Sequence, residues 1–410
     1  MAFNNPIYSS NSIRELSTAV RPIWAVKKDG GSLGDAYLKW IKDAYNSGLE
    51  IIKPIAKVQL ANYLLYQGYH QSLSLDDSEW SGDEGEFVPL AGNKKEVVIN
   101  DLFDTVQQVS NKLSTFNITT IAVPHNTNAS DREGARVVKD VMETIKYTNN
   151  MTKIYRQMIK ESIIFGESYL LILWNKFLAD IHPAWLEASK KKTAPETIKV
   201  NGEEVKFDPD SPIRIGDICY PRVLPWEKVL DPQRCPEECQ YLIWPQFKHI
   251  DELKFDYPKV ASKIKPTQDA FSFDIQTHYS SKLEDHALVL ECWGRNSRFL
   301  NDGIHFICTP DLMLVEPEDN PYPRYENSEW GNLPLERLTD IDLPGSLFPM
   351  STFQILAPLQ KKLNQFYTQA AENILLGAHL KMLRPKQGKI NVQQFKNGPS
   401  YIDYVYPFEP

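Results

Sequence analysis

The stretch Ser130–Trp174, SDREGARVVKDVMETIKYTNNMTKIYRQMIKESIIFGESYLLILW, holds the clearest structural pattern in this 410-residue chain. Its first letters, SDRE, have the spacing of a capping box, and apolar residues then recur at helical spacing, so we expect a helix to begin here. The paired asparagines predict the end of that helix, and a second helix is expected over residues 152–165. Gly166 predicts a turn into an apolar strand over Tyr169–Trp174.

Helices are also expected on both sides of this unit. Apolar residues at helical spacing predict one helix over Leu33–Gly68, with a kink or break at Pro54, and another from Ile99 to Leu113. The β-branched run Asn117–Pro124 predicts a strand. A long helix is expected from Phe353 onward.

The middle of the chain is expected to be rich in β-structure. The dipeptide Asn201-Gly202 predicts the turn of a β-hairpin, because both residues tolerate positive φ angles. A short helix is expected to start at His249 and to run past Pro258 towards Ile264. Further strands are expected over 213–224, 226–230, 239–244, 287–295 and 303–308. With the helices on either side, this pattern predicts an α+β fold.

The long C-terminal helix carries a continuous apolar stripe, which predicts a packing surface. Its members recur every three or four residues: Leu356, Leu359, Leu363, Phe366, Ala370 and Ile374. Beyond the stripe, the sign of the charge changes from acidic to basic. The basic residues are Lys381, Arg384, Lys386, Lys389 and Lys396. They are candidates for contact with DNA phosphates or with another subunit.

The composition of the chain limits the classes of protein to which it can belong. Hydrophobic residues make up 42% of the chain and charged residues 24%, as is typical of a folded soluble protein. The formal net charge of −8 excludes a globally basic protein that coats nucleic acid. It does not exclude a protein that forms a passage through which DNA slides. The five cysteines form no CxxC pair, which predicts free thiols in a reducing compartment such as the cytoplasm. The longest apolar run is far shorter than the about 20 residues that span a bilayer, so no membrane role is expected.

Sequence motifs for catalysis and cofactor binding are absent. The chain has no G-x-x-x-x-G-K-[ST] loop, no G-x-S-x-G nucleophile elbow, no H-E-x-x-H and no dinucleotide fingerprint. The eight histidines are scattered singly, which gives no metal-ligand spacing. We therefore expect no catalytic residue, no metal and no cofactor, and a protein that is not an enzyme.

The order of the elements from Asn117 to Trp174 continues through further landmarks. These are Pro225-Trp226, Asp231-Pro232, Glu291-Cys292-Trp293, Pro344-Gly345-Ser346 and the pair Gln360 and Asn364 on the long helix. This order resembles the portal (head-to-tail connector) protein of tailed bacteriophages, most like those of short-tailed and crAss-like phages. The resemblance covers roughly residues 35 to 400 and rests on order and spacing.

The resemblance implies a structural protein of the virion. Portal subunits form a ring of about twelve copies at one capsid vertex, and double-stranded DNA passes through its channel without sequence specificity during packaging and ejection. The implied partners are further copies of the chain, the DNA, the terminase, the major capsid protein and a tail adaptor or ring protein. Such a protein is made in the cytoplasm of the bacterial host.

The resemblance also implies domain boundaries. Residues 1–245 would form the wing, 246–285 a first stem helix and linker, 286–345 a clip-like β region, 346–378 the second stem helix, and 379–410 the start of a return to the wing. The crown and a long wing helix would follow Pro410, so we expect a longer natural protein. The first stem helix, near Asp251–Ile264, is shorter than the paired helices that a stem normally has.

Two other functions remain open. One is another head-tail adaptor or capsid protein, which would also form rings or shells but with a different copy number. The other is a nucleic-acid-processing or carbohydrate-processing enzyme, which would be a small oligomer with one well-formed pocket. The size of the oligomer separates these alternatives.

Overall fold

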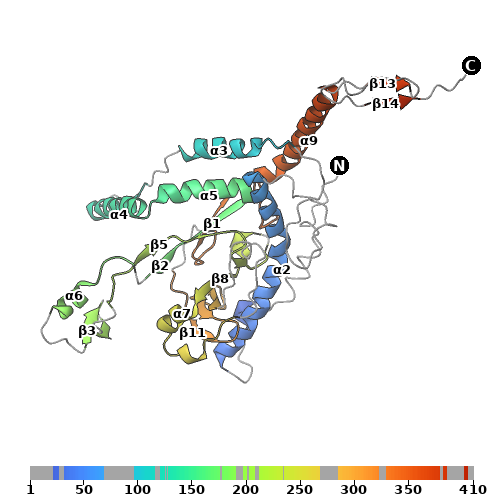
Figure 1. Cartoon of the computed structure of the whole chain (residues 1–410). Helices are drawn as coiled ribbons and strands as arrows, with labels where there is room; N and C mark the ends of the chain where they lie inside the picture. The colour runs from blue at the N-terminus through green and yellow to red at the C-terminus, as the bar shows by residue number, and fades with distance from the viewer. Residues whose placement is uncertain are drawn as a thin grey trace, which may run out of the picture. The chain divides into compact units, whose positions relative to one another are not determined.

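The protein has an α+β fold, as the sequence predicts. The computed structural model describes residues 22–26, 32–68, 97–115, 121–124, 126, 128–175, 178–190, 197–200, 203–207, 212–233, 235–267, 285–322, 329–378, 382–385 and 401–404. The chain divides into two compact units: unit 1 comprises residues 1–61 and 106–352, and unit 2 comprises residues 62–105 and 353–410. Figure 1 shows the elements of both units.

The predicted helix-helix-glycine-strand pattern is confirmed in unit 1. It consists of α4 (Ala129–Thr148), α5 (Met151–Phe165), β1 (Glu167–Leu171) and β2 (Leu173–Asn175). The capping-box prediction is wrong, because Asn128 is the N-cap and Ser130 already lies inside the helix. The predicted single strand is divided at Ile172, so β1 and β2 belong to different sheets.

Strand β1 lies at the centre of a three-stranded sheet. Its neighbours are β12 (Leu335–Thr339) and β6 (Arg222–Val223), both antiparallel to it. All five residues of β1 are buried, since α5 covers the strand in addition to its two neighbours. The sequence analysis did not predict β12.

The larger sheet of unit 1 has five antiparallel strands. In spatial order they are β11 (Met313–Glu318), β10 (Ile304–Cys308), β9 (His286–Gly294), β8 (Tyr241–His249) and β7 (Val229–Leu230). The strands predicted over 239–244, 287–295 and 303–308 are confirmed, and β8 extends further than expected. Strand β11 was not predicted, and it includes Pro317. Pro317 is tolerated there because β11 is an edge strand.

One hydrophobic core joins the two sheets of unit 1. Its fully buried side chains come from both sheets and from the segment before β12, and the largest are Tyr169, Trp293 and Trp330. Helix α2 (Leu33–Gln67) contributes aromatic contacts to the same unit, including an edge-on contact between Trp40 and Tyr241 with ring centroids 5.1 Å apart. Aromatic side chains bury the most apolar area per residue, so these contacts dominate the packing.

Smaller elements complete unit 1. Strand β2 pairs with β5 (Asp217–Cys219), and α6 (Pro183–Ser189) packs near the hairpin of β3 (Thr197–Val200) and β4 (Glu203–Lys206). This hairpin confirms the prediction made from Asn201-Gly202. The helix expected to run towards Ile264 is wrong in length: α7 spans only Ile250–Asp256, and a single 3-10 turn follows at Ala261–Lys263. The continuous strands expected over 213–224 and 226–230 are reduced to β5, β6 and β7.

The remaining helices match their predictions closely. Helix α2 includes Pro54 without ending there, and α3 spans Asp101–Ser114. No strand forms in residues 121–124, the described part of the strand predicted over Asn117–Pro124. Unit 2 contains most of α9 (Thr352–Ala378) and a parallel pair, β13 (Met382–Pro385) and β14 (Tyr401–Tyr404). The wing, stem and clip boundaries stay predictions.

A buried ion pair lies beside the core of unit 1. The Lys228 ammonium is 3.8 Å from a carboxylate oxygen of Glu167, and both side chains are 2% exposed. The Tyr169 hydroxyl donates a 2.6 Å hydrogen bond to the other oxygen of Glu167. The ammonium also lies 3.6 Å from the centroid of the Tyr169 ring and donates to the carbonyl of Pro225. Burial lowers the pKa of Lys228 to about 8, although the Glu167 charge acts in the opposite direction.

Candidate subunit-contact surface

The inner face of α9 in unit 2 is polar and buried. The side-chain amide of Gln360 donates to the backbone carbonyl of Ile99 at 2.5 Å, and the side-chain oxygen of Asn364 accepts from the backbone N–H of Ile99 at 3.2 Å. One turn further on, the Thr368 hydroxyl accepts from the N–H of Val97 at 3.0 Å. Residues 360, 364 and 368 are four apart, so they align on one face of the helix. This face holds the segment 97–99 through the backbone groups of Val97 and Ile99.

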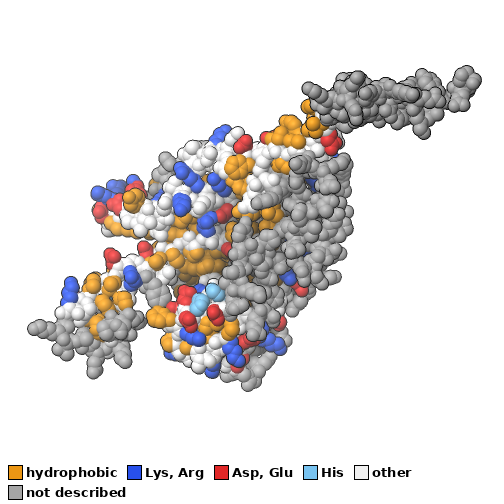
Figure 2. Space-filling view, in the orientation of Figure 1, with side chains coloured by type: hydrophobic (Ala, Val, Ile, Leu, Met, Phe, Trp, Pro, Cys, Tyr) orange, Lys and Arg blue, Asp and Glu red, His pale blue; other side chains and the backbone are white. Residues whose placement is uncertain are grey.

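The apolar stripe predicted from the sequence lies on a different face of α9. At about 100° per residue, the stripe is rotated by roughly a quarter turn from the Gln360 and Asn364 face. Its middle and end are exposed: Leu359 is 65% exposed, Phe366 67% and Ile374 71%. Leu356 and Leu363 are half-buried, and Ala370 is exposed. Figure 2 shows hydrophobic side chains on the surface of this helix.

Exposure of this kind is unfavourable for a helix that stays in water. Each square ångström of apolar surface removed from water contributes roughly 25 cal/mol. Three large apolar side chains on one stripe therefore form a surface that gains free energy when another protein surface covers it. The structure shows the stripe without such a cover within the described residues of one chain.

The predicted basic residues follow α9 in the sequence. Lys381, Lys386, Lys389 and Lys396 lie outside the described residues, and Arg384 is described only as a backbone position in β13. Their assignment to DNA or subunit contact stays a prediction.

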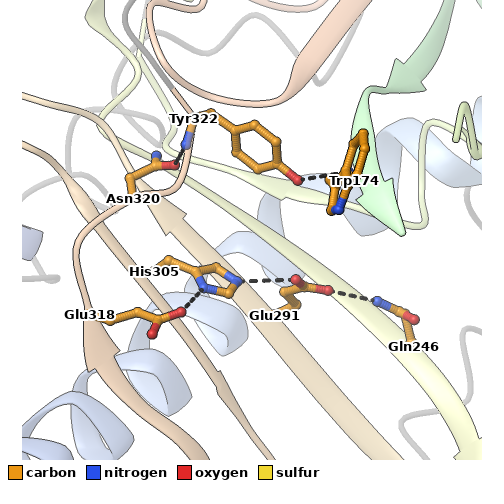
Figure 3. A network of polar contacts seen from close by, with 7 residues as sticks. All are labelled: Trp174, Gln246, Glu291, His305, Glu318, Asn320 and Tyr322. Atoms are coloured by element: carbon orange, nitrogen blue, oxygen red, sulfur yellow. Dashed lines mark hydrogen bonds and ion pairs between the residues drawn. The ribbon is translucent and has the colours of Figure 1, made fainter. Parts of the chain in front are cut away.

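The sequence analysis missed a polar network on the five-stranded sheet (Figure 3). His305 of β10 lies between two carboxylates: its Nε2 is 3.1 Å from Glu291 of β9, and its Nδ1 is 3.1 Å from Glu318 of β11. The second oxygen of Glu291 accepts from the side-chain amide of Gln246 in β8. The network therefore links four neighbouring strands. Because each residue of the network is many positions from the next in the sequence, no local sequence pattern predicts the network.

The geometry around His305 favours the charged imidazolium. A neutral imidazole has one N–H, so it could donate to only one of the two carboxylates. Burial disfavours the charge and is the largest single influence, but hydrogen bonds to Glu291 and Glu318, together with their charges, outweigh it and raise the pKa of His305. The arrangement joins neighbouring strands of the sheet.

We expect the stability contributed by His305 to be present at pH 6 and to fall as the pH rises through the raised pKa. The folded protein holds this proton more tightly than the unfolded chain, so alkaline conditions remove the contribution. At pH 6, His305→Phe should lower the free energy of unfolding by about 1.5 kcal/mol, and the loss should shrink at pH 9. Urea unfolding of both proteins at each pH measures this difference. An equal loss at both pH values would contradict the charged state.

Unit 1 has a hollow on its surface. A surface hollow of about 610 Å³ is lined by Asp231, Glu237, Trp24 and Phe299 among others, and its lining includes no histidine or cysteine. Trp24 and Phe299 stack on each other with ring centroids 4.3 Å apart. No group of three or more His, Cys, Asp or Glu side chains among the described residues could hold a metal ion. The cysteines are free thiols.

The helices were compared with the requirements for crossing a membrane, and the sequence with those of known proteins. Within the described ranges, no helix combines the length and the hydropathy needed to cross a bilayer. Comparison of the sequence with protein-family models and with curated proteins found no match to either.

Proposed function

We propose that the chain is a subunit of a phage portal, a ring at one capsid vertex that provides the channel for double-stranded DNA packaging and ejection. The observation that carries the proposal is the exposed apolar stripe of α9, at Leu359, Phe366 and Ile374. A subunit of a closed ring must present surfaces that its neighbours cover. The resemblance of the element order to that of phage portal proteins supports the proposal that this ring is a portal.

Other properties agree with this proposal. An acidic chain, with a net charge of −8, repels DNA phosphates, which suits a channel that DNA must pass without being held. The side chains of Gln360 and Asn364 hydrogen-bond to the backbone of Ile99 and so hold one face of α9 against this segment. The apolar stripe lies on a different face of the helix and is exposed. In this proposal the terminase, the capsid protein and a tail adaptor are partners, and the virion is the site of function.

The test is the oligomeric state of the purified protein. We expect native mass spectrometry and negative-stain images to give a ring near twelve copies with a central hole. The variant Leu359→Ser/Phe366→Ser should shift the protein to monomers or short fragments, with at least a tenfold loss of rings, because two apolar anchors are removed from the stripe.

A matched control uses polar exposed positions of the same helix. Gln365→Ser/Gln369→Ser introduces the same residue type on α9 and should leave the rings intact. Loss of rings in both variants would indicate a general effect on the helix and would remove support for the stripe. A monomeric or dimeric wild-type protein under assembly conditions would contradict the portal proposal.

Ring size separates the portal from the other structural alternative. A head-tail adaptor or capsid component would also assemble, but with a different copy number or as a closed shell. An enzyme would remain a small oligomer after the stripe is changed.

A further inference from the structure

The surface hollow of unit 1 lies where connecting segments of the chain meet helix α2. Its walls come mainly from the 3-10 turn Ile23–Ala25, the connection between β7 and β8, the connection between β9 and β10, and Ser47 of α2. Every described residue of the lining belongs to unit 1. The volume of about 610 Å³ lies within the range of sites that hold a small ligand or a short piece of peptide.

One carboxylate of this lining is buried and only partly hydrogen-bonded. Asp231 is 8% exposed, and its Oδ2 accepts from the Gln240 backbone N–H and from the Gln233 side-chain amide, both at 3.1 Å. Among the described residues, no donor forms a hydrogen bond with its Oδ1. Burial raises the pKa of Asp231, and the two hydrogen bonds counteract this only in part. A cationic ligand in the hollow would complete the environment of this carboxylate.

The other polar groups on this side of the hollow add further acceptors. The side-chain NH₂ group of Gln233 donates to Asp231. That of Gln240 donates to the backbone carbonyl of Glu238 at 2.9 Å. In both glutamines the side-chain oxygen is therefore the group left for a ligand, and it is an acceptor. Glu237 and Glu238 add two exposed carboxylates to the lining.

An aromatic wall, formed by Trp24 and Phe299, completes the hollow. The two rings stack with their centroids 4.3 Å apart and are 38% and 53% exposed. The Arg298 guanidinium lies 4.6 Å from the centroid of the Phe299 ring, so a guanidinium already stacks on this wall within the protein. Arg298 is the one base among the described lining residues, against three acids. The hollow therefore favours a flat cation with several N–H donors, which describes a guanidinium better than an ammonium.

The hydroxyl groups of the lining favour a peptide over a free polyamine. The Ser297 hydroxyl oxygen accepts from the N–H groups of Phe299 and Leu300, which leaves its O–H as a donor. Ser47 and Arg298 are further donors in the lining. A peptide that carries an arginine also carries backbone carbonyls, which these donors can bind. A polyamine has only donors to offer at neutral pH.

We propose that this hollow is a binding site for an arginine side chain presented by a peptide segment of a partner protein. The guanidinium donates to Asp231 Oδ1 and to the glutamine oxygens, and it lies against the aromatic wall. Glu237 and Glu238 attract the positive charge of the approaching segment. The inference is independent of the proposed ring, because it depends only on residues of unit 1.

The test measures binding of short peptides to the full chain by isothermal titration calorimetry. The peptide acetyl-Gly-Arg-Gly-amide should bind saturably, with a Kd of about 1 mM or below. The matched peptide with citrulline in place of arginine has a side chain of the same length without the charge, and it should bind at least about tenfold more weakly. Equal binding of both peptides, or no saturable binding of the arginine peptide up to about 10 mM, would overturn the inference.

Two variants locate the binding site on the protein. Asp231→Asn keeps an oxygen that accepts from the Gln240 N–H but removes the charge, so it should weaken binding by about tenfold. Glu237→Gln/Glu238→Gln changes exposed residues alone and should weaken binding by about threefold. Urea unfolding checks that the variants are folded, and the glutamate variant carries the test if Asp231→Asn is not. An unchanged Kd in the folded variants would overturn the inference.

A control variant and a second ligand test the specificity of the site. Asp180→Asn removes a carboxylate at an exposed position of unit 1 outside the lining, and it should leave the Kd unchanged. An effect as large as that of Asp231→Asn would assign the binding to overall charge and would contradict the inference. Spermidine should bind at least about threefold more weakly than the arginine peptide. If spermidine binds more tightly, the hollow is a polyamine site and the peptide assignment is wrong.

Discussion

Lys228→Met is expected to lower the free energy of unfolding by about 3–5 kcal/mol, because it removes the ammonium group that pairs with a buried carboxylate. The Glu167 side chain is 2% exposed, and Lys228 is the cation that lies 3.8 Å from it. Methionine fills much of the same space but cannot balance the charge or donate to the Pro225 carbonyl. Equilibrium unfolding in urea, followed by tryptophan fluorescence, measures the loss.

Two controls separate the buried charge from other effects of the substitution. Lys228→Met/Glu167→Gln removes both charges while the glutamine oxygen can still accept from Tyr169, so the double variant should regain most of the lost stability. Lys42→Met breaks an ion pair with Asp311 whose side chains are 43% and 91% exposed, and it should cost less than 1 kcal/mol, roughly the upper limit for surface pairs. A Lys228→Met effect no larger than that of Lys42→Met would contradict the proposed role of the pair.

Local patterns in the sequence predict much of the fold. Periodic apolar residues identify α2, α4, α5 and α9, and the Asn-Gly pair identifies the β3–β4 hairpin, because each signal depends only on residues close in the chain. The predicted ends of the helices are less accurate than their positions, because a local pattern can fit more than one starting residue. At α4, SDRE has capping-box spacing, yet Asn128 two residues earlier is the N-cap.

Features that depend on distant partners could not be predicted. Strand β12 forms because Leu335–Thr339 pairs with β1, about 170 residues earlier, and its own sequence LERLT gives no clear alternation. The buried face of α9 is likewise unexpected. Gln360 and Asn364 are polar, and they are buried because they bind the backbone of residue 99, which no helical pattern reveals.

The apolar stripe of α9 shows most clearly what a sequence pattern does not predict. The sequence correctly places Leu359, Phe366 and Ile374 on one face of a helix, but an apolar face predicts only that something covers it. The structure shows that the cover is not supplied by the described residues of the same chain. The exposed stripe therefore supports the proposal of an assembly made above, whereas the sequence alone would equally have allowed an internal core.

Gly166→Ala is expected to destabilise unit 1 by about 2–4 kcal/mol, through two separate effects. Gly166 ends α5 with φ +92°, a conformation that disfavours residues with a Cβ atom. An added Cβ would also lie 3.2 Å from backbone atoms of Pro349, Met350 and Ser351. Backbone atoms in a packed turn cannot move aside as a flexible side chain could, so the turn into β1 must distort. Urea unfolding measures the loss.

Two other glycines separate the effects at Gly166. Gly345 has φ +79° but open space around the added Cβ, so Gly345→Ala should cost only the conformational part, about 1–2 kcal/mol. Gly134 lies within α4 with nothing near its added Cβ, so Gly134→Ala should stabilise the helix by about 0.5–1 kcal/mol. The expected order is therefore a gain at Gly134, a moderate loss at Gly345 and the largest loss at Gly166. If Gly166→Ala cost no more than Gly345→Ala, the contact with residues 349–351 would not constrain the turn that leads into the central strand.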